Sequence, residues 1–90
     1  MSVVYTAVIR MQRQNLSETE LLSVINNTFA SHEQSAGSKV ETLLWQNNID
    51  PEQCNWVCGY IDHGDNLPHQ YETLRHNLIK QCQDNFNVQH

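Results

Sequence analysis

The chain has 90 residues, about the length of one domain, and its formal charge of −5 comes from ten acidic and five basic residues. The acidic residues are scattered and no basic stripe is present, which argues against binding to nucleic acid. No hydrophobic run of about 18 residues is present, so the sequence predicts neither a membrane span nor a membrane partner.

Three further features of the composition bear on where and how the protein acts. The N-terminus shows no signal-peptide pattern, and three cysteines cannot all pair within one chain. These features favour a reducing cytoplasm with free thiols. Asn and Gln together supply nineteen residues, so the polar surface is largely neutral and suits binding by hydrogen bonds and shape.

Residues 3–11 (VVYTAVIRM) predict the first strand, because β-branched and aromatic residues dominate the segment. Alternation places Val3, Tyr5 and Ile9 on one face. The other face is also fairly apolar, which favours a central position in a sheet.

A helix is predicted over residues 15–32. Ser17 and Glu20 form a capping box, in which the hydroxyl and the carboxylate each accept from an early backbone N–H. Apolar residues then recur at helical spacing, so one helix face packs on the sheet; these residues are Leu21, Leu22, Ile25, Thr28 and Phe29. Residues 33–38 form the following loop.

Residues 38–62 can be interpreted as strands or as helices. Val, Thr, Trp, Tyr and Ile are frequent in them, and Gly59 inside a helix would cost about 1 kcal/mol relative to Ala. We therefore predict two strands, 39–46 and 55–62, joined by a turn at Asp50-Pro51. The alternative makes both segments helical.

The last helix is predicted to follow the loop Asp-His-Gly-Asp-Asn. Pro68 opens this helix, where its missing N–H costs nothing. A buried stripe follows at spacings of three and four residues: Tyr71, Leu74, Leu78, Cys82 and Phe86.

The predicted fold is a single α+β domain over residues 1–90, in the order β-α-β-β-α, with a three-stranded sheet and two helices packed on one face. The alternative is one N-terminal strand followed by a mostly helical remainder. A small open sheet has edge strands and one uncovered face, so the fold also favours a homodimer.

The stretch CNWVCGYIDHGDNLPH, residues 54–69, concentrates the residues that could carry chemistry. In a strand, Cys54 and Cys58 would lie about 13 Å apart, too far for one zinc ion or one disulfide. A zinc site would need both cysteines with His63 and His69, at a spacing that fits no standard finger. We therefore predict no metal and no cofactor, and two cysteines that act as small buried hydrophobes.

A polar site is the second interpretation of this stretch. Asp62, His63, Asp65 and His69 could supply a general base with an orienting carboxylate. A polar turn is the simpler interpretation, because Gly64 frees the backbone and aspartate stabilises turns.

Large side chains are the candidate anchors for a partner protein. Trp and Tyr carry much of the binding energy in protein interfaces, and Arg is enriched with them. The candidates are Trp45, Trp56, Tyr60 and Arg10. For each tryptophan, burial in the core is the favoured prediction, and the anchor role is the alternative.

The first sixty residues resemble the small tautomerase-type β-α-β subunits. The shared features are a short strand from residue 3, the capped helix in LSETELLSVI and a strand that runs into IDPEQCNW. Catalysis in that family uses an N-terminal proline amine, whereas the matching position here is Ser2. The resemblance therefore implies the fold and not the activity.

The function predicted from these features is a non-catalytic protein-binding module. It would be a small cytoplasmic inhibitor or adaptor, of the type that phages and mobile elements encode, and it would dock on a protein partner. The alternative is a small oligomeric enzyme of tautomerase-like fold with acid-base chemistry at a subunit interface.

Overall fold

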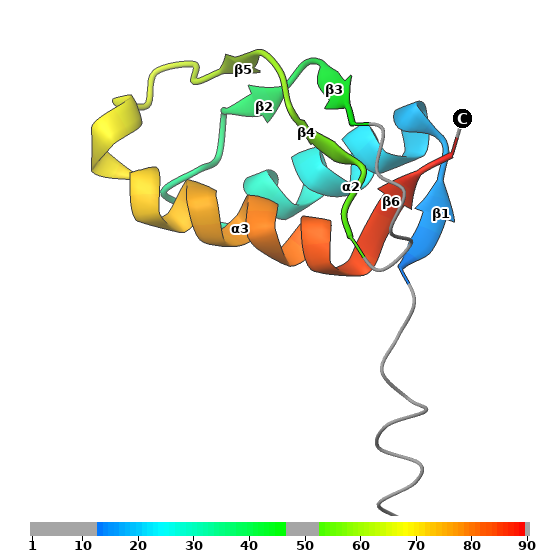
Figure 1. Ribbon diagram of the computed structural model, residues 1–90. Coiled ribbons are helices and arrows are strands. Elements are labelled where there is room, and N and C mark those ends of the chain that lie inside the picture. Colours follow the sequence, from blue (N-terminus) through cyan, green and yellow to red (C-terminus); the bar gives the residue numbers. More distant parts are fainter. Residues whose placement is uncertain (1–12, 47–52, 90) are drawn as a thin grey trace, which may run out of the picture.

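The computed structural model describes residues 13–46 and 53–89, and these contain two α-helices and several short strands (Figure 1). The helices are α2 (Glu18–Ala30) and α3 (Glu72–Asn85), and the 3-10 turn η1 (Pro68–Gln70) precedes α3. The strands are β1 (Gln14–Leu16), β2 (Lys39–Val40), β3 (Leu43–Trp45), β4 (Trp56–Cys58), β5 (Ile61–Asp62) and β6 (Phe86–Val88). The predicted α+β class is confirmed.

Helix α2 begins at the predicted capping box. The Ser17 hydroxyl accepts from the backbone N–H of Glu20 at 3.1 Å, and the Glu20 carboxylate accepts from the Ser17 N–H at 3.0 Å. Leu21, Ile25 and Phe29 are fully buried, at the helical spacing of four residues. The first predicted helix and its core face are therefore confirmed, but the helix is shorter than residues 15–32, and residues 15–16 belong to β1.

Strands β2 to β5 form a two-stranded antiparallel ribbon. β2 pairs with β5 and β3 with β4, and the register is the same in both pairs: Val40 lies opposite Ile61, and Leu43 lies opposite Cys58. The choice of strands rather than helices for residues 39–46 and 55–62 is thus confirmed.

The buried side of the ribbon switches between the half formed by β2 and β5 and the half formed by β3 and β4. Val40 and Leu43 are both buried, although residues three apart in a regular strand point to opposite sides. The change occurs at Thr42 and Gly59, where the Gly59 N–H donates to the Thr42 carbonyl at 2.8 Å and the Tyr60 N–H donates to the Thr42 hydroxyl at 2.8 Å. A Cβ atom on Gly59 would lie 2.3 Å from that hydroxyl oxygen, so the close approach requires glycine.

Helix α3 runs from Glu72 to Asn85, whereas the predicted stripe begins at Tyr71 and ends at Phe86. Pro68 opens η1, Tyr71 is buried between η1 and α3, and Leu78 and Cys82 form the buried face of α3. The prediction that Phe86 continues this helix is wrong: its backbone is extended (φ −136°, ψ 145°) and it begins β6. Phe86, Asn87 and Val88 instead pair along the backbone with another strand.

The partner of β6 is β1, in a short parallel pair that the sequence did not predict. Gln14 lies opposite Phe86, and Leu16 lies opposite Val88. In the described part of the chain, strands pair only two by two, so the predicted three-stranded sheet and its order are not confirmed. The predicted strand 3–11 and the Asp50-Pro51 turn lie outside the described residues.

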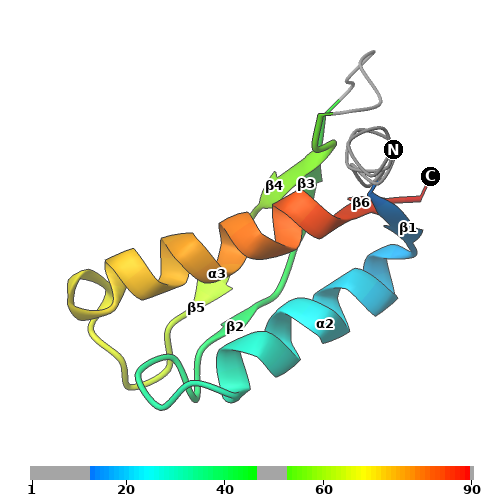
Figure 2. The same ribbon diagram turned by 90° about the horizontal axis from the view of Figure 1, so that it is seen from below.

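The core lies between the two helices and the ribbon. Figures 1 and 2 show α2 and α3 side by side on one face of the ribbon, with the β1–β6 pair at one end. Neither described helix is long and apolar enough to cross a bilayer. The buried cluster consists of Leu21, Ile25, Phe29, Val40, Leu43, Trp56, Leu78, Cys82 and Val88.

Candidate functional site

Of the four candidate anchors, two lie at the surface. The Trp45 residue is 46 % exposed at the end of β3, and Tyr60 is 62 % exposed between β4 and β5. Trp56 is fully buried, so it belongs to the core and is not available to a partner. Arg10 lies outside the described residues.

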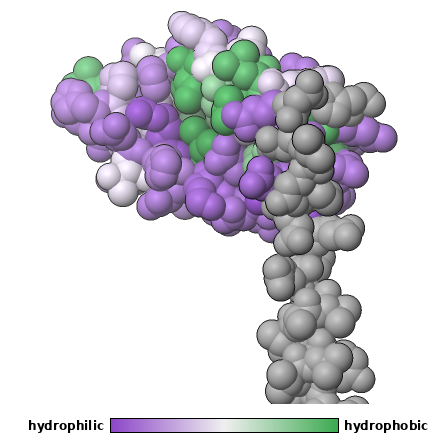
Figure 3. Space-filling model, viewed as in Figure 1, coloured by the Kyte–Doolittle hydropathy of each residue, from purple (hydrophilic) through white to green (hydrophobic). Residues whose placement is uncertain are grey.

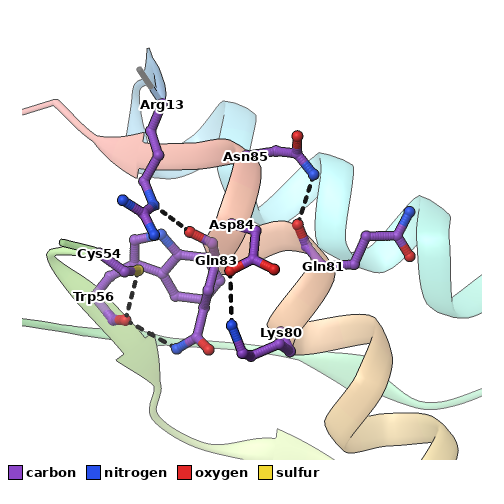
Figure 4. Close-up of polar contacts among 8 residues, drawn as sticks. All are labelled: Arg13, Cys54, Trp56, Lys80, Gln81, Gln83, Asp84 and Asn85. Atoms are coloured by element: carbon purple, nitrogen blue, oxygen red, sulfur yellow. Dashed lines mark hydrogen bonds and ion pairs between the residues drawn. The ribbon is translucent and has the colours of Figure 1, made fainter. Parts of the chain in front are cut away.

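Trp56 is held in the core by hydrogen bonds at the end of α3. Its indole N–H donates to the Phe86 carbonyl at 3.0 Å, and its own carbonyl accepts from the Gln83 amide and the Cys54 thiol, both at 3.2 Å. Arg13 donates from Nε to the Gln83 carbonyl at 2.5 Å (Figure 4). This network ties β1, β4 and α3 together and is structural in character.

An apolar surface remains on the ribbon. Leu44 is 57 % exposed and lies next to Trp45 on β3, and Tyr60 lies further along the same ribbon. Figure 3 shows hydrophobic surface over part of these strands, whereas most of the rest of the visible surface formed by described residues is hydrophilic; tryptophan and tyrosine are not coloured as hydrophobic on this scale. We call Leu44, Trp45 and Tyr60 the ribbon patch.

The predicted polar site is divided among separate contacts. The Asp62 carboxylate accepts from the Gly64 N–H at 2.9 Å, which makes a turn. His63 is half-buried, and its Nδ1 hydrogen-bonds to the Tyr71 hydroxyl rather than to a carboxylate. Asp65 and His69 are exposed, and His69 lies in η1. The structure therefore does not form the carboxylate-histidine pair that general-base chemistry would use.

Tyr71 is the centre of a small aromatic and cationic cluster. The His63 ring meets the Tyr71 ring edge-on, with centroids 5.6 Å apart. The Arg75 guanidinium lies 5.0 Å from the Tyr71 centroid and donates to the Pro68 carbonyl at 2.9 Å. These contacts fasten the loop that follows β5 to the start of α3.

The thiols of the three cysteines all have raised pKa values. Burial raises the pKa of Cys58 to about 12, and the nearby thiols of Cys82 and Cys54 add to the effect. Burial also raises the pKa of Cys54 and of Cys82. Thiols with raised pKa values stay protonated at neutral pH and are weak nucleophiles and weak metal ligands. Across residues 13–46 and 53–89, no group of three His, Cys, Asp or Glu side chains could hold a metal ion.

A hollow of about 350 Å³ lies beside the predicted polar site, between the loop that follows α2 and the loop that leads into η1. Asp65 is the one predicted residue that lines it. Sequence reasoning missed the others, which are Gln34, Asn66, Leu67, Gln70 and Tyr71.

The other residues that line the hollow show no pattern in the sequence that marks them as part of a site. Asn66 directly follows the Asp-His-Gly-Asp turn and could have been included with it. Gln34 belongs to a different loop, and only the folded chain brings it to this hollow. No family model, curated protein or solved structure matches this chain.

Proposed function

We propose that this chain is a non-catalytic protein-binding module, a small cytoplasmic inhibitor or adaptor that docks on a protein partner. The observation that supports it is the ribbon patch, with Leu44 57 %, Trp45 46 % and Tyr60 62 % exposed. Full burial of a large apolar side chain contributes about 1.5–3 kcal/mol. These three residues lie on one two-stranded ribbon and are the candidate anchors of such an interface.

The chemistry of the surrounding surface supports the same proposal. An anchor works best when polar contacts of small individual effect surround it and exclude water. Glu41, Thr42 and Gln46 are exposed on the strand that carries two of the patch residues. A homodimer is the special case in which a second copy covers the patch.

Site-specific photocrosslinking tests the proposal. A benzoylphenylalanine at position 60 would be compared with one at position 81, where Gln81 is exposed on α3 and outside the patch. We expect irradiation in cells to link a defined protein to position 60 and not to position 81. Identical products from both positions would contradict the proposal, and a product made only of this chain would identify the homodimer.

The crosslinked partner then allows a comparison of variants. We expect Tyr60→Ala and Trp45→Ala to weaken its binding about tenfold or more, since each truncates an anchor. His63→Ala should leave the affinity unchanged. Loss of binding only in a folded His63→Ala variant would move the functional site to residues 62–65.

A second candidate is the small oligomeric enzyme with acid-base chemistry, and the hydrogen bond between His63 and Tyr71 favours it. His63 would be the acid-base group of this candidate. This candidate requires that a second subunit complete the hollow beside Tyr71. A sedimentation measurement that finds only monomers at cellular concentration would remove it.

A further inference from the structure

The hollow beside Tyr71 stands on a framework of two loops in close contact. Gly37 and Gly64 adopt positive φ values of 92° and 59°, which other residues adopt rarely. A Cβ atom on Gly64 would lie 2.6 Å from the Gly37 carbonyl oxygen. The Ser38 hydroxyl donates to the His63 carbonyl at 3.0 Å, which joins the loops again. The walls of the hollow are therefore held in place before any ligand arrives.

The lining of the hollow offers a carboxylate and three amide oxygens as hydrogen-bond acceptors, and the amides of Gln34 and Gln70 offer donors as well. Both amide protons of Asn66 are used, by the Ala36 carbonyl at 3.1 Å and the Ser38 hydroxyl at 2.7 Å, so only its carbonyl oxygen is left to offer. The Tyr71 hydroxyl is engaged by His63. Both oxygen atoms of the Asp65 carboxylate can accept hydrogen bonds.

Three of the lining side chains have polar groups to spare. Within the described residues, the side chains of Asp65, Gln34 and Gln70 make no hydrogen bond or ion pair, and all three residues are exposed. Asp65 is the one charged residue of the lining, and the cationic Arg75 lies against the Tyr71 ring. Leu67, 52 % exposed, adds an apolar side chain, whereas Tyr71 is only 3 % exposed.

These features match a guanidinium group on an aliphatic stem. A guanidinium has five N–H donors and no acceptor, and it binds a carboxylate through two parallel hydrogen bonds. Its planar face and methylene stem pack on apolar and aromatic side chains. Arg75 already makes this kind of contact with Tyr71 from within the chain.

We propose that the hollow accepts an arginine side chain of the partner protein, with Asp65 as the carboxylate that receives its guanidinium. This inference rests on the proposed protein-binding function and names the chemistry of one contact. Asn66, Gln34 and Gln70 supply further acceptor oxygens, and Leu67 packs on the stem of the arginine. The hollow lies on the loop that leaves β5, so one partner could reach both the hollow and Tyr60.

The test is a titration of the ¹⁵N-labelled chain with Nα-acetyl-arginine amide, followed through backbone amide signals. We expect saturable shifts at Gln34, Asp65 and Gln70, with weak affinity because one side chain acts alone. Nα-acetyl-citrulline amide has the same shape without the charge and should bind about tenfold more weakly or not at all. Equal binding of the two compounds, or shifts confined to other residues, would overturn the proposal.

Variants of Asp65 and ligands related to arginine make the test specific for this carboxylate and for the guanidinium. Asp65→Asn should weaken the binding of the arginine compound about tenfold. Asp84→Asn makes the same change on α3, far along the chain from the hollow, and should not change the affinity. Equal losses in both variants would show that net charge alone matters and would overturn the assignment of Asp65. Equal binding of the lysine compound would overturn the assignment to a guanidinium, and tighter binding of free arginine would indicate a free amino-acid ligand instead of a protein side chain.

The outcome is separable from that of the proposed function. The titration uses no partner protein, and the crosslink at position 60 does not depend on the hollow. If the titration fails while the crosslink forms, only the arginine contact is wrong.

Discussion

Two asparagine side chains replace missing strand partners. Asn26 donates to the Val40 carbonyl at 3.1 Å and accepts from the Val40 N–H at 2.7 Å, and Asn55 makes the same pair of hydrogen bonds to Val88, both at 2.9 Å. Both valines are buried, so water cannot easily satisfy these backbone groups. An amide side chain fits because it carries a donor and an acceptor side by side.

This arrangement predicts a specific cost for Asn55→Asp. The carboxylate keeps the shape of the amide but loses the N–H donor, so the Val88 carbonyl is left unsatisfied and faces an oxygen atom. We expect the free energy of unfolding to fall by about 1–3 kcal/mol at neutral pH, measured by urea denaturation. Asn77→Asp is the control, because Asn77 is exposed on α3, and it should change stability by less than about 0.5 kcal/mol. A loss in the control as large as that in Asn55→Asp would show that added charge, and not the hydrogen bond, matters.

Among the elements, the ribbon depends on the contact between Thr42 and Gly59. Gly59→Ala would bring a methyl group to 2.3 Å from the Thr42 hydroxyl oxygen. We expect a loss of about 1–3 kcal/mol in unfolding free energy, because one strand must move or Thr42 must rotate and release the Tyr60 N–H.

A double-mutant cycle with Thr42→Ala separates this clash from other effects. Removal of the hydroxyl leaves the Thr42 carbonyl oxygen as the nearest remaining atom, at 3.2 Å. Gly59→Ala should therefore cost clearly less in the Thr42→Ala background than in the natural chain. Strict additivity of the two changes would mean that the clash does not shape the ribbon.

For the molecule as a whole, α3 is held to the rest of the fold through Leu78 and Cys82. Leu78 is almost fully buried in the central cluster, between the helices and the ribbon. Leu78→Ala should lower the free energy of unfolding by about 2–5 kcal/mol. Since small domains are stable by only about 5–15 kcal/mol, this variant should also melt at a visibly lower temperature.

His76→Ala is the matched control on the same helix. His76 is exposed, so the change should alter stability by less than about 0.5 kcal/mol. Circular dichroism during heating measures both variants. Similar melting temperatures for the two would mean that α3 does not pack through the face that Leu78 marks.

The sequence by itself determined the elements whose signals are local. Helix α2 follows from the capping box and from apolar residues four apart, and the strands of the ribbon follow from β-branched and aromatic residues on both sides of Gly59. For the candidate sites, the local pattern identified the turn at Asp62. These predictions succeed because each depends on residues that are neighbours in the chain.

Only the tertiary structure decided the rest. Phe86 lies at helical spacing from Cys82, yet it starts a strand because β1, 72 residues earlier, offers backbone partners. Trp56 had the same local character as Trp45, and its burial is set by the distant Phe86 carbonyl that accepts from its indole. His63 is joined to Tyr71 instead of to an aspartate, and Gln34 and Asp65 line one hollow from two different loops. Except for Tyr71, which is eight residues from His63, the partner lies far away in sequence, and local patterns carry no information about which distant groups folding will bring together.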